Sequence, residues 1–214
     1  MIKKIKILVK KLIPELFVKN KKINIGLYGP PNSGKTTLAN RICSDILGHE
    51  EKIGETSNIA HETRKIAIKE ELVLKLNNKK IKFNLIDTPG IATRIDYENF
   101  LKSGMSEKES KQRAKEATKG VIESIKWLDN MDIVIIVLDS TKNPYTHVNL
   151  TILGNLEARK IKTLIVANKT DLKSSKLKKI QEAFPKYNVV GVSAKFSINM
   201  DELYNNLITL ARKK

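Results

Sequence analysis

The sequence predicts an α/β fold: a three-layer sandwich in which helices cover both faces of a mostly parallel sheet of about six strands. First, short apolar runs bounded by turn residues alternate with helical patterns, as in doubly wound sheets. Second, 214 residues with 41% hydrophobic content can form one large core without disulfides or metals. Third, only Asn77 and Asn78 separate two of the runs, so this pair should form an antiparallel hairpin at the sheet edge.

The expected elements follow from these patterns in chain order. The strands should occupy residues 23–28, 65–76, 81–86, 133–139, 163–168 and 188–192. One helix should follow Gly34, and the others should cover about 106–129, 146–159, 174–184 and 199–212. Ser106 and Glu109 have the spacing of a capping box. In the helix that follows this capping box, one face is expected to pack on the core. It carries Ala114, Ala117, Val121, Ile125 and Leu128.

The chain is strongly basic and carries one cysteine. Forty Lys and Arg residues against 23 Asp and Glu give a formal charge of +17, which favours a polyanion such as RNA, alone or in a ribosomal particle, or an anionic membrane surface. The alternative is that lysine only maintains solubility. Cys43 cannot form an internal bridge, and the longest apolar run, residues 133–138, is too short for a membrane span. We expect a cytoplasmic protein.

Residues 1–22 are expected to form a basic extension before a single domain over residues 23–214. The extension holds eight lysines and one glutamate. In a helix over residues 2–17 the lysines would oppose an apolar face made of Ile2, Ile5, Leu8, Val9, Leu12, Ile13, Leu16 and Phe17. Pro14 should kink this helix, and Ile7 falls on the other side. The face can meet an anionic membrane or a groove, or it can lie back on the domain.

A phosphate-binding loop follows the first expected strand. It has the G-x-x-x-x-G-K-[ST] pattern and leads through Thr37 into a helix; its residues are Gly29, Pro30, Pro31, Asn32, Ser33, Gly34, Lys35 and Thr36. Glycines allow several backbone N–H groups to converge on phosphate oxygens, and the helix N-terminus adds positive potential. Lys35 is expected to reach the β and γ phosphates, and the Thr36 hydroxyl to bind Mg²⁺. The loop alone does not separate GTP from ATP.

Three further segments follow expected strands and favour guanine. After the third strand come Asp87, Thr88, Pro89 and Gly90; Asp87 can reach the Mg²⁺ shell and the Gly90 N–H the γ-phosphate. The fifth strand ends in Asn168, Lys169, Thr170 and Asp171. The Asp171 carboxylate can accept from N1–H and the exocyclic amine of guanine, whereas adenine offers no such donor pair. After the last strand, a backbone N–H can reach guanine O6 from Ser193, Ala194 and Lys195.

Together these segments resemble the P-loop GTPases, and the Asp-Thr-Pro-Gly form points to the Era-like branch and its tRNA-modification relatives. The resemblance spans about residues 23–212 and implies a G domain with the P-loop NTPase fold that binds GTP or GDP with Mg²⁺, without the KH domain of Era. Residues 57–64 look like that branch's effector loop. The resemblance therefore places Thr63 as a further Mg²⁺ ligand, with Thr56 a weaker candidate, while His61 and Glu62 depart from the pattern.

The same residues indicate a slow GTPase. Lys35, Thr63 and Gly90 are the candidate catalytic residues, but Ile91 stands where Ras-like proteins carry a water-orienting glutamine. In the Era-like branch the residue matched by Asn32 can help to bind K⁺, which implies K⁺-stimulated hydrolysis, with carbonyls near residues 57–61 as further ligands. The alternative is that Asn32 only shapes the loop. Ile91 also allows a catalytically silent, guanine-nucleotide-dependent interaction module.

A long segment between Gly90 and the fourth strand is the expected second switch. It covers residues 91–131 and carries charges and helix signals, and in this fold the γ-phosphate orders that region. Tyr97, Phe100 and Met105 are candidate contact residues for a partner. The family also allows a nucleotide-dependent dimer. The leading hypothesis is a switch whose GTPase cycle controls association with RNA.

Overall fold

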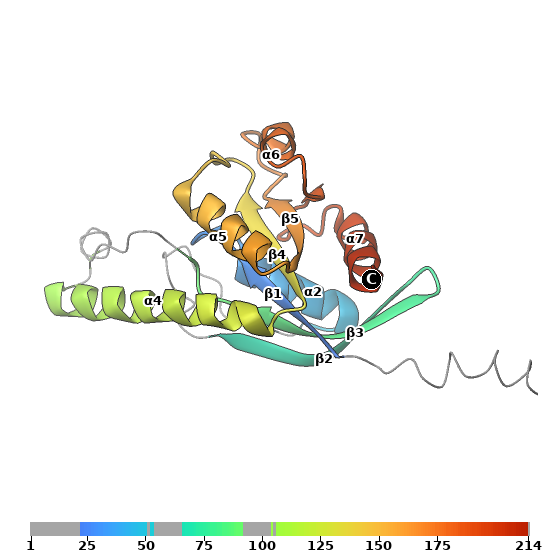
Figure 1. Ribbon diagram of the computed structural model, residues 1–214, viewed down its shortest axis with the longest axis horizontal. Helices are drawn as coiled ribbons and strands as arrows, with labels where there is room; N and C mark the ends of the chain where they lie inside the picture. Colours follow the sequence, from blue (N-terminus) through green and yellow to red (C-terminus); the bar gives the residue numbers. More distant parts are fainter. Residues whose placement is uncertain (1–21, 51, 54–65, 92–103, 105, 214) are drawn as a thin grey trace, which may run out of the picture.

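The computed structural model describes residues 22–50, 52–53, 66–91, 104 and 106–213. Six strands form one sheet: β1 (Ile23–Tyr28), β2 (Ala67–Leu76), β3 (Lys79–Asp87), β4 (Ile133–Asp139), β5 (Lys162–Asn168) and β6 (Val189–Gly191). Their order across the sheet is β2-β3-β1-β4-β5-β6. All neighbours run parallel except β2 and β3. The expected α/β fold with one antiparallel edge is confirmed (Figure 1).

The β2–β3 hairpin turns at the two asparagines. Asn77 and Asn78 have φ values of 48° and 59°, in the left-handed region that a two-residue hairpin turn requires and that asparagine tolerates. Leu76 pairs with Lys79 directly across the turn. β3 begins two residues earlier than expected because this turn is the shortest possible, and pairing therefore starts at Lys79.

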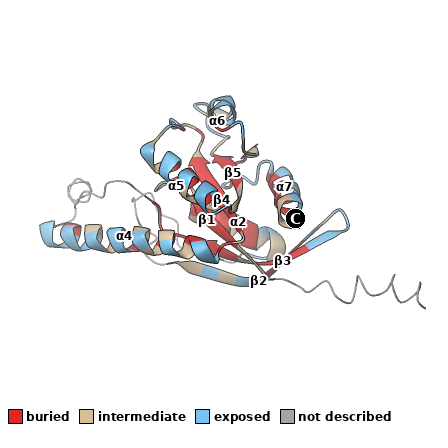
Figure 2. Cartoon of the chain, in the orientation of Figure 1, coloured by how far each residue is buried: buried red, intermediate tan, exposed pale blue. Residues whose placement is uncertain are grey.

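Helices cover both faces of the sheet (Figures 1 and 2). One face carries α2 (Lys35–Leu47) and α7 (Met200–Arg212), which pack on β1 and β3 through side chains such as Leu38 and Leu203. The other carries α4 (Glu107–Trp127), α5 (His147–Ala158) and α6 (Leu177–Ala183). The interior of the sheet is buried on both sides, as Figure 2 shows in red for β4 and β5. This is the three-layer arrangement that the alternating pattern predicts.

Helix α4 begins at the capping box that the sequence predicts. Glu109 N–H donates to the Ser106 hydroxyl at 3.4 Å, and Ser106 N–H donates to the Glu109 carboxylate at 3.0 Å. On its apolar face, Val121 and Ile125 pack on the core. The Tyr28 hydroxyl donates to the Ser124 carbonyl at 2.9 Å and joins α4 to β1. A short 3₁₀ turn, η1 (Leu128–Asn130), ends the segment that was expected to be one helix over 106–129.

Other helix and strand boundaries differ by a few residues. α6 covers Leu177–Ala183 and not 174–184, because Ser175 N–H bonds back to the Leu172 carbonyl in a turn before the helix starts. β6 is limited to Val189–Gly191, where pairing with β5 ends. Lys65, the expected first residue of the second strand, lies outside the described residues; β2 begins at Ala67. The extension over residues 1–21 also lies outside them. None of the described helices is long and apolar enough to span a membrane.

A β-bulge interrupts β2. Lys69 pairs with Leu85 and Leu72 with Phe83, so Glu70 and Glu71 together oppose one residue of β3. Glu71 has a φ of 60°, which is strained for a glutamate. Its N–H donates to the Asn84 side chain at 3.1 Å, which supplies the partner that the interrupted strand ladder does not. The sequence pattern did not predict this bulge.

Candidate functional site

The loops that follow β1, β3, β4 and β5 meet at one edge of the sheet. These strands are parallel, so their carboxyl ends lie together. The loop after β6 completes this edge. Val192 N–H donates to the Ala167 carbonyl at 2.9 Å and so joins this loop to the end of β5. The structure therefore brings the four sequence segments of the expected site to a common edge.

The loop between β1 and α2 folds around the Lys35 side chain. Lys35 is 6% exposed, and its ammonium group donates to the Pro30 carbonyl at 2.9 Å. Gly34 has a φ of 91°, which favours glycine. Asn32 also adopts a left-handed conformation, with a φ of 59°. This conformation shows that Asn32 shapes the backbone of the loop, and it leaves the role of its side chain to be tested.

Thr36 and Asp87 form the charged centre of this edge. The Thr36 hydroxyl donates to Asp87 Oδ2 at 2.6 Å. Asp87 is fully buried, and its Oδ1 has no hydrogen-bond partner among the described residues. Burial raises the pKa of Asp87, against the lowering effects of the Thr36 hydrogen bond and of Lys35. Burial lowers the pKa of Lys35 to about 8, against the effect of Asp87.

Bound ligands of the right charge would oppose both shifts. A cation beside Asp87 would favour the ionised carboxylate, and an anion beside Lys35 would favour the ammonium form. The unpaired Oδ1 of Asp87 offers a hard oxygen of the kind that Mg²⁺ selects. The residues present therefore fit a magnesium ion next to a phosphate. Thr63, the third expected magnesium ligand, lies outside the described residues.

The Asn168 side chain connects two loops. Its Nδ2 donates to the Ser33 carbonyl at 3.0 Å, and its Oδ1 accepts from the Ala194 N–H at 3.0 Å. Asn168 is 3% exposed, so both bonds are shielded from water. The phosphate-binding loop and the loop over Ser193, Ala194 and Lys195 are thus held by a single amide. These contacts tie the end of β5 to both neighbouring segments.

Lys169 is held by a partner that the sequence analysis missed. Its ammonium group lies 2.6 Å from Asp139 Oδ2 and 2.7 Å from the Asn32 carbonyl. Asp139, the last residue of β4, also accepts from the Thr141 N–H and hydroxyl. Burial alone would raise the pKa of Asp139, but the bonds from Lys169 and Thr141 outweigh it and lower the pKa. The only sequence signal was an aspartate at the carboxyl end of a buried strand.

The segment after β3 lies directly against the phosphate-binding loop. Ile91 N–H donates to the Gly29 carbonyl at 3.0 Å, and Thr88 Oγ1 donates to the Leu27 carbonyl at 2.6 Å. A Cβ atom on Gly90 would lie 2.8 Å from Pro31 Cα. Ile91 is 4% exposed and belongs to the core. Its side chain therefore faces the interior and has no polar group that can orient water.

The expected base-binding residues are exposed at the carboxyl edge of the sheet. Asp171 is exposed at the end of the segment that starts with Asn168, and Lys195 is exposed in the loop after β6. The Lys195 ammonium group lies 5.2 Å from the centre of the Phe196 ring, which is 58% exposed. Both polar groups are open to a ligand from solvent. Residues 92–103 and Met105, which include the candidate partner contacts Tyr97 and Phe100, lie outside the described residues.

Two features define the class of P-loop GTPases. A Gly-x-x-x-x-Gly-Lys-Thr loop joins a strand to a helix at the edge of a doubly wound sheet, and Asn-Lys-x-Asp follows a neighbouring strand. Residues 24–169 match the model of the family described as 50S ribosome-binding GTPase, so the chain belongs to that family.

Individual relatives carry related names. The chain is 30% identical over 186 residues to GTPase Era of Borrelia garinii subsp. bavariensis, and the match covers 85% of this chain and 54% of the relative. It is 31% identical over 154 residues to the tRNA modification GTPase MnmE of Helicobacter acinonychis, with 72% of this chain and 28% of the relative covered. The chain spans about half the length of the Era relatives it matches.

Solved structures support the fold. Era in complex with MgGDPNP and nucleotides of 16S ribosomal RNA superimposes with a TM-score of 0.66 at 21% identity, covering 89% of this chain and 57% of that one. A probable GTP-binding protein, EngB, gives a TM-score of 0.55 at 22% identity, covering 89% of this chain and all of that one. At these identities the superpositions establish the fold alone.

Proposed function

We propose that the chain binds GTP and GDP with Mg²⁺ at the carboxyl edge of the sheet and hydrolyses GTP slowly, as a molecular switch. The observation that carries this proposal is the pair of hydrogen bonds by which Asn168 joins the phosphate-binding loop to the Ser193–Lys195 loop. This pair supports the proposal because it holds the phosphate-binding loop and the Ser193–Lys195 loop on two sides of one amide, as a nucleotide spanning both requires. The named GTPase relatives support the same activity.

In this proposal each residue of the centre has a stated task. Lys35 leaves the Pro30 carbonyl and binds the β and γ phosphates, and the Gly90 N–H meets the γ-phosphate. Thr36, Thr63 and Asp87 hold Mg²⁺, which neutralises charge on the phosphates when it is bound. The 2.6 Å bond between Thr36 and Asp87 supports this assignment because it orients one carboxylate oxygen and leaves the other available.

The base is proposed to lie between Asp171 and the Ser193–Lys195 loop. Asp171 accepts from guanine, and the stem of Lys169 covers one face of the ring. The bonds from the Lys169 ammonium group to Asp139 and to the Asn32 carbonyl support this role, because they extend its stem along the edge. The selectivity is tested by comparing displacement of a fluorescent GDP by GDP and by ADP.

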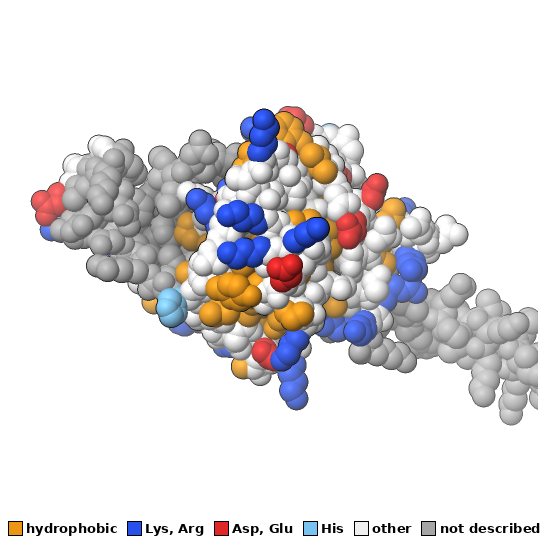
Figure 3. Space-filling model, turned by 90° about the horizontal axis from the view of Figure 1, so that it is seen from above, with side chains coloured by type: hydrophobic (Ala, Val, Ile, Leu, Met, Phe, Trp, Pro, Cys, Tyr) orange, Lys and Arg blue, Asp and Glu red, His pale blue; other side chains and the backbone are white. Residues whose placement is uncertain are grey.

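The Era-like relatives and the basic charge favour RNA or a ribosomal particle as the partner. The family description names ribosome binding, and one Era structure contains ribosomal RNA. Five exposed lysines also lie in and beside α6: Lys173, Lys176, Lys178, Lys179 and Lys186. Figure 3 looks onto the side of the molecule that carries α6 and shows basic side chains spread across it. Such a surface attracts phosphate backbones without reading sequence.

Steady-state GTP hydrolysis, measured with and without total ribosomal RNA, tests the proposal. Turnover that requires Mg²⁺ and rises with RNA supports both the activity and the partner class. GTP binding without turnover under any condition favours the interaction module, for which the buried Ile91 is the specific observation. Sedimentation with anionic liposomes tests the membrane alternative for residues 1–22, and light scattering with GDP and a GTP analogue tests the nucleotide-dependent dimer.

A further inference from the structure

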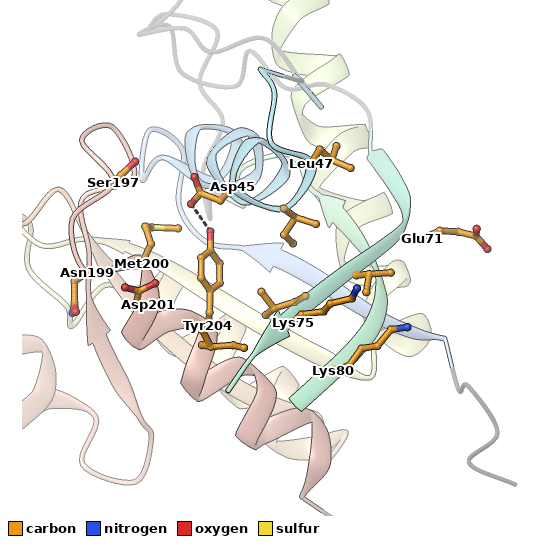
Figure 4. Close-up of a pocket in the computed structure, with 14 residues that line it drawn as sticks. Asp45, Leu47, Glu71, Lys75, Lys80, Ser197, Asn199, Met200, Asp201 and Tyr204 are labelled. Atoms are coloured by element: carbon orange, nitrogen blue, oxygen red, sulfur yellow. Dashed lines mark hydrogen bonds between the residues drawn. The ribbon is translucent and has the colours of Figure 1, made fainter. Parts of the chain in front are cut away.

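A groove separates the β2–β3 hairpin from the C-terminal end of α2 and the first turns of α7 (Figure 4). Its volume is about 920 Å³. It lies away from the phosphate-binding loop, which adjoins the opposite, N-terminal end of α2. None of the proposed nucleotide ligands lines it.

The groove combines an apolar floor with a polar rim. The half-buried side chains of Ile46, Leu47, Val73 and Leu76 line it together with the buried Leu74. The Tyr204 hydroxyl donates to Asp45 Oδ2 at 2.6 Å and joins α7 to α2 along one wall, as the dashed line in Figure 4 marks. Partly exposed aliphatic groups on two separate elements, α2 and β2, favour an apolar ligand that spans them.

The described chain begins at the edge of this groove. Lys22 forms ion pairs with Glu70 at 3.4 Å and with Glu71 at 3.9 Å, and Glu71 also lines the groove. The next residue, Ile23, packs on the same core cluster as Leu76 and Ile46. Residues 1–21 are therefore tethered close to the apolar floor, which gives them a high local concentration there.

The size and chemistry of these residues match the groove. Residues 2–13, which precede Pro14, make a helix about 18 Å long at the standard rise. The stretch of β2 from Glu71 to Leu76 is about 17 Å long. Residues 14–21 can span up to about 26 Å, which is enough for the helix to fold back. One helix face holds Ile2, Ile5, Leu8, Val9, Leu12 and Ile13.

We propose that residues 2–13 lie in this groove as an amphipathic helix, with the apolar face on Ile46, Leu47 and Leu76 and the lysines in water. Asp201 and Asp45 on the groove rim would attract the lysines at the edge of this helix. The inference does not depend on nucleotide binding. It assigns the basic extension an intramolecular site, in place of a membrane or an RNA.

Amide hydrogen exchange on the full-length chain tests this site. In the wild type the amides of residues 2–13 should exchange at least about tenfold more slowly than in Leu76→Glu and Leu47→Glu, each of which places a charge on the groove floor. The matched control is Leu150→Glu, which adds the same charge at a 50% exposed leucine of α5 on the other side of the sheet and should leave the protection unchanged. Unchanged exchange in β4 shows that each variant is folded.

Three outcomes overturn the proposal. Rapid exchange of residues 2–13 in the wild type means that the segment does not dock. Protection that survives both groove substitutions places it elsewhere on the chain. Protection that disappears on dilution assigns the groove to a second copy of the chain and not to its own extension.

Discussion

The Asn168 side chain lies against the turn before α2: its Nδ2 donates to the Ser33 carbonyl, and a Cβ atom on the next residue, Gly34, would collide with it. The end of β5 and the phosphate-binding loop therefore pack closely through this amide and the absence of a side chain at Gly34. Loss of this amide is expected to affect both folding and ligand binding.

Asn168→Ala should lower the free energy of unfolding by about 2 to 3 kcal/mol, because the Ser33 carbonyl and the Ala194 N–H lose their buried partner. GDP affinity should fall more than about tenfold, since both connected loops become free to move. Urea unfolding and fluorescent-GDP titration measure the two effects. Asn206→Ala, which removes an exposed amide pair with Asn188, is the control and should change neither. Equal stability of Asn168→Ala and the wild type would contradict the assigned role.

Gly90→Ala tests the contact between the second switch and the phosphate-binding loop. The new methyl group would lie 2.8 Å from Pro31 Cα and 2.9 Å from Pro31 N, so one of the two backbones must move. We expect GTP hydrolysis to fall by about a hundredfold or more, because the γ-phosphate donor is displaced. Gly154→Ala on α5 adds the same methyl group where nothing lies within 4 Å. That control should keep full activity and gain slight helix stability.

Asp139→Asn should weaken the protein in a pH-dependent way. The pKa of Asp139 is lowered in the folded state, so its ionised form adds stability above the unfolded pKa of about 3.9 and loses that contribution as the pH falls through the folded value. The variant should be less stable than the wild type by about 1 kcal/mol at neutral pH, and the difference should shrink in acid. Urea unfolding across this range measures it.

Asp129→Asn provides the control for this pH dependence. Asp129 pairs with Arg159 at 2.8 Å, but its side chain is 70% exposed, and such pairs contribute little. If both variants show the same pH profile, the Asp139–Lys169 pair is an ordinary surface ion pair.

Asp171→Asn should shift base preference from guanine toward xanthine, whose donor and acceptor pattern suits an amide. We expect GDP affinity to fall at least about a hundredfold and xanthosine diphosphate affinity to rise. Competition with fluorescent GDP measures both. Asp201→Asn removes a different exposed carboxylate, outside the nucleotide segments, and should have no effect. Retained tight GDP binding by Asp171→Asn would refute the base assignment.

Asn32→Gly separates the two roles proposed for this residue. Glycine keeps the left-handed backbone that Asn32 adopts but removes the side chain. If the side chain binds K⁺, the wild type should hydrolyse GTP faster in KCl than in NaCl, and the variant should lose that difference while it still binds GDP. Equal rates in both salts for the wild type eliminate the K⁺ mechanism, and a variant that remains K⁺-stimulated restricts Asn32 to shaping the loop.

Local patterns were sufficient to predict most of the fold. The hairpin at Asn77 and Asn78 and the capping box at Ser106 depend on neighbours in sequence, and both are confirmed. The nucleotide segments were identifiable because their residue types and order are constrained by one ligand. Asp139 was missed because its partner Lys169 lies 30 residues away. The bulge at Glu71 was missed for a related reason: it depends on Asn84 across the hairpin, and two glutamates give no turn signal.

The bulge at Glu70 and Glu71 divides β2 into two halves. The half next to residues 54–65, Ala67 to Lys69, and the half that lines the groove, Leu72 to Leu76, are each paired with β3 in their own register. A pull on the first half can be absorbed at Glu70 and Glu71 before it reaches the second. A pull strong enough to slide the second half by one residue would turn Leu72 and Leu74 from the core to the opposite face of the sheet. The bulge therefore separates the register of the half that lines the groove from the register of the half before it.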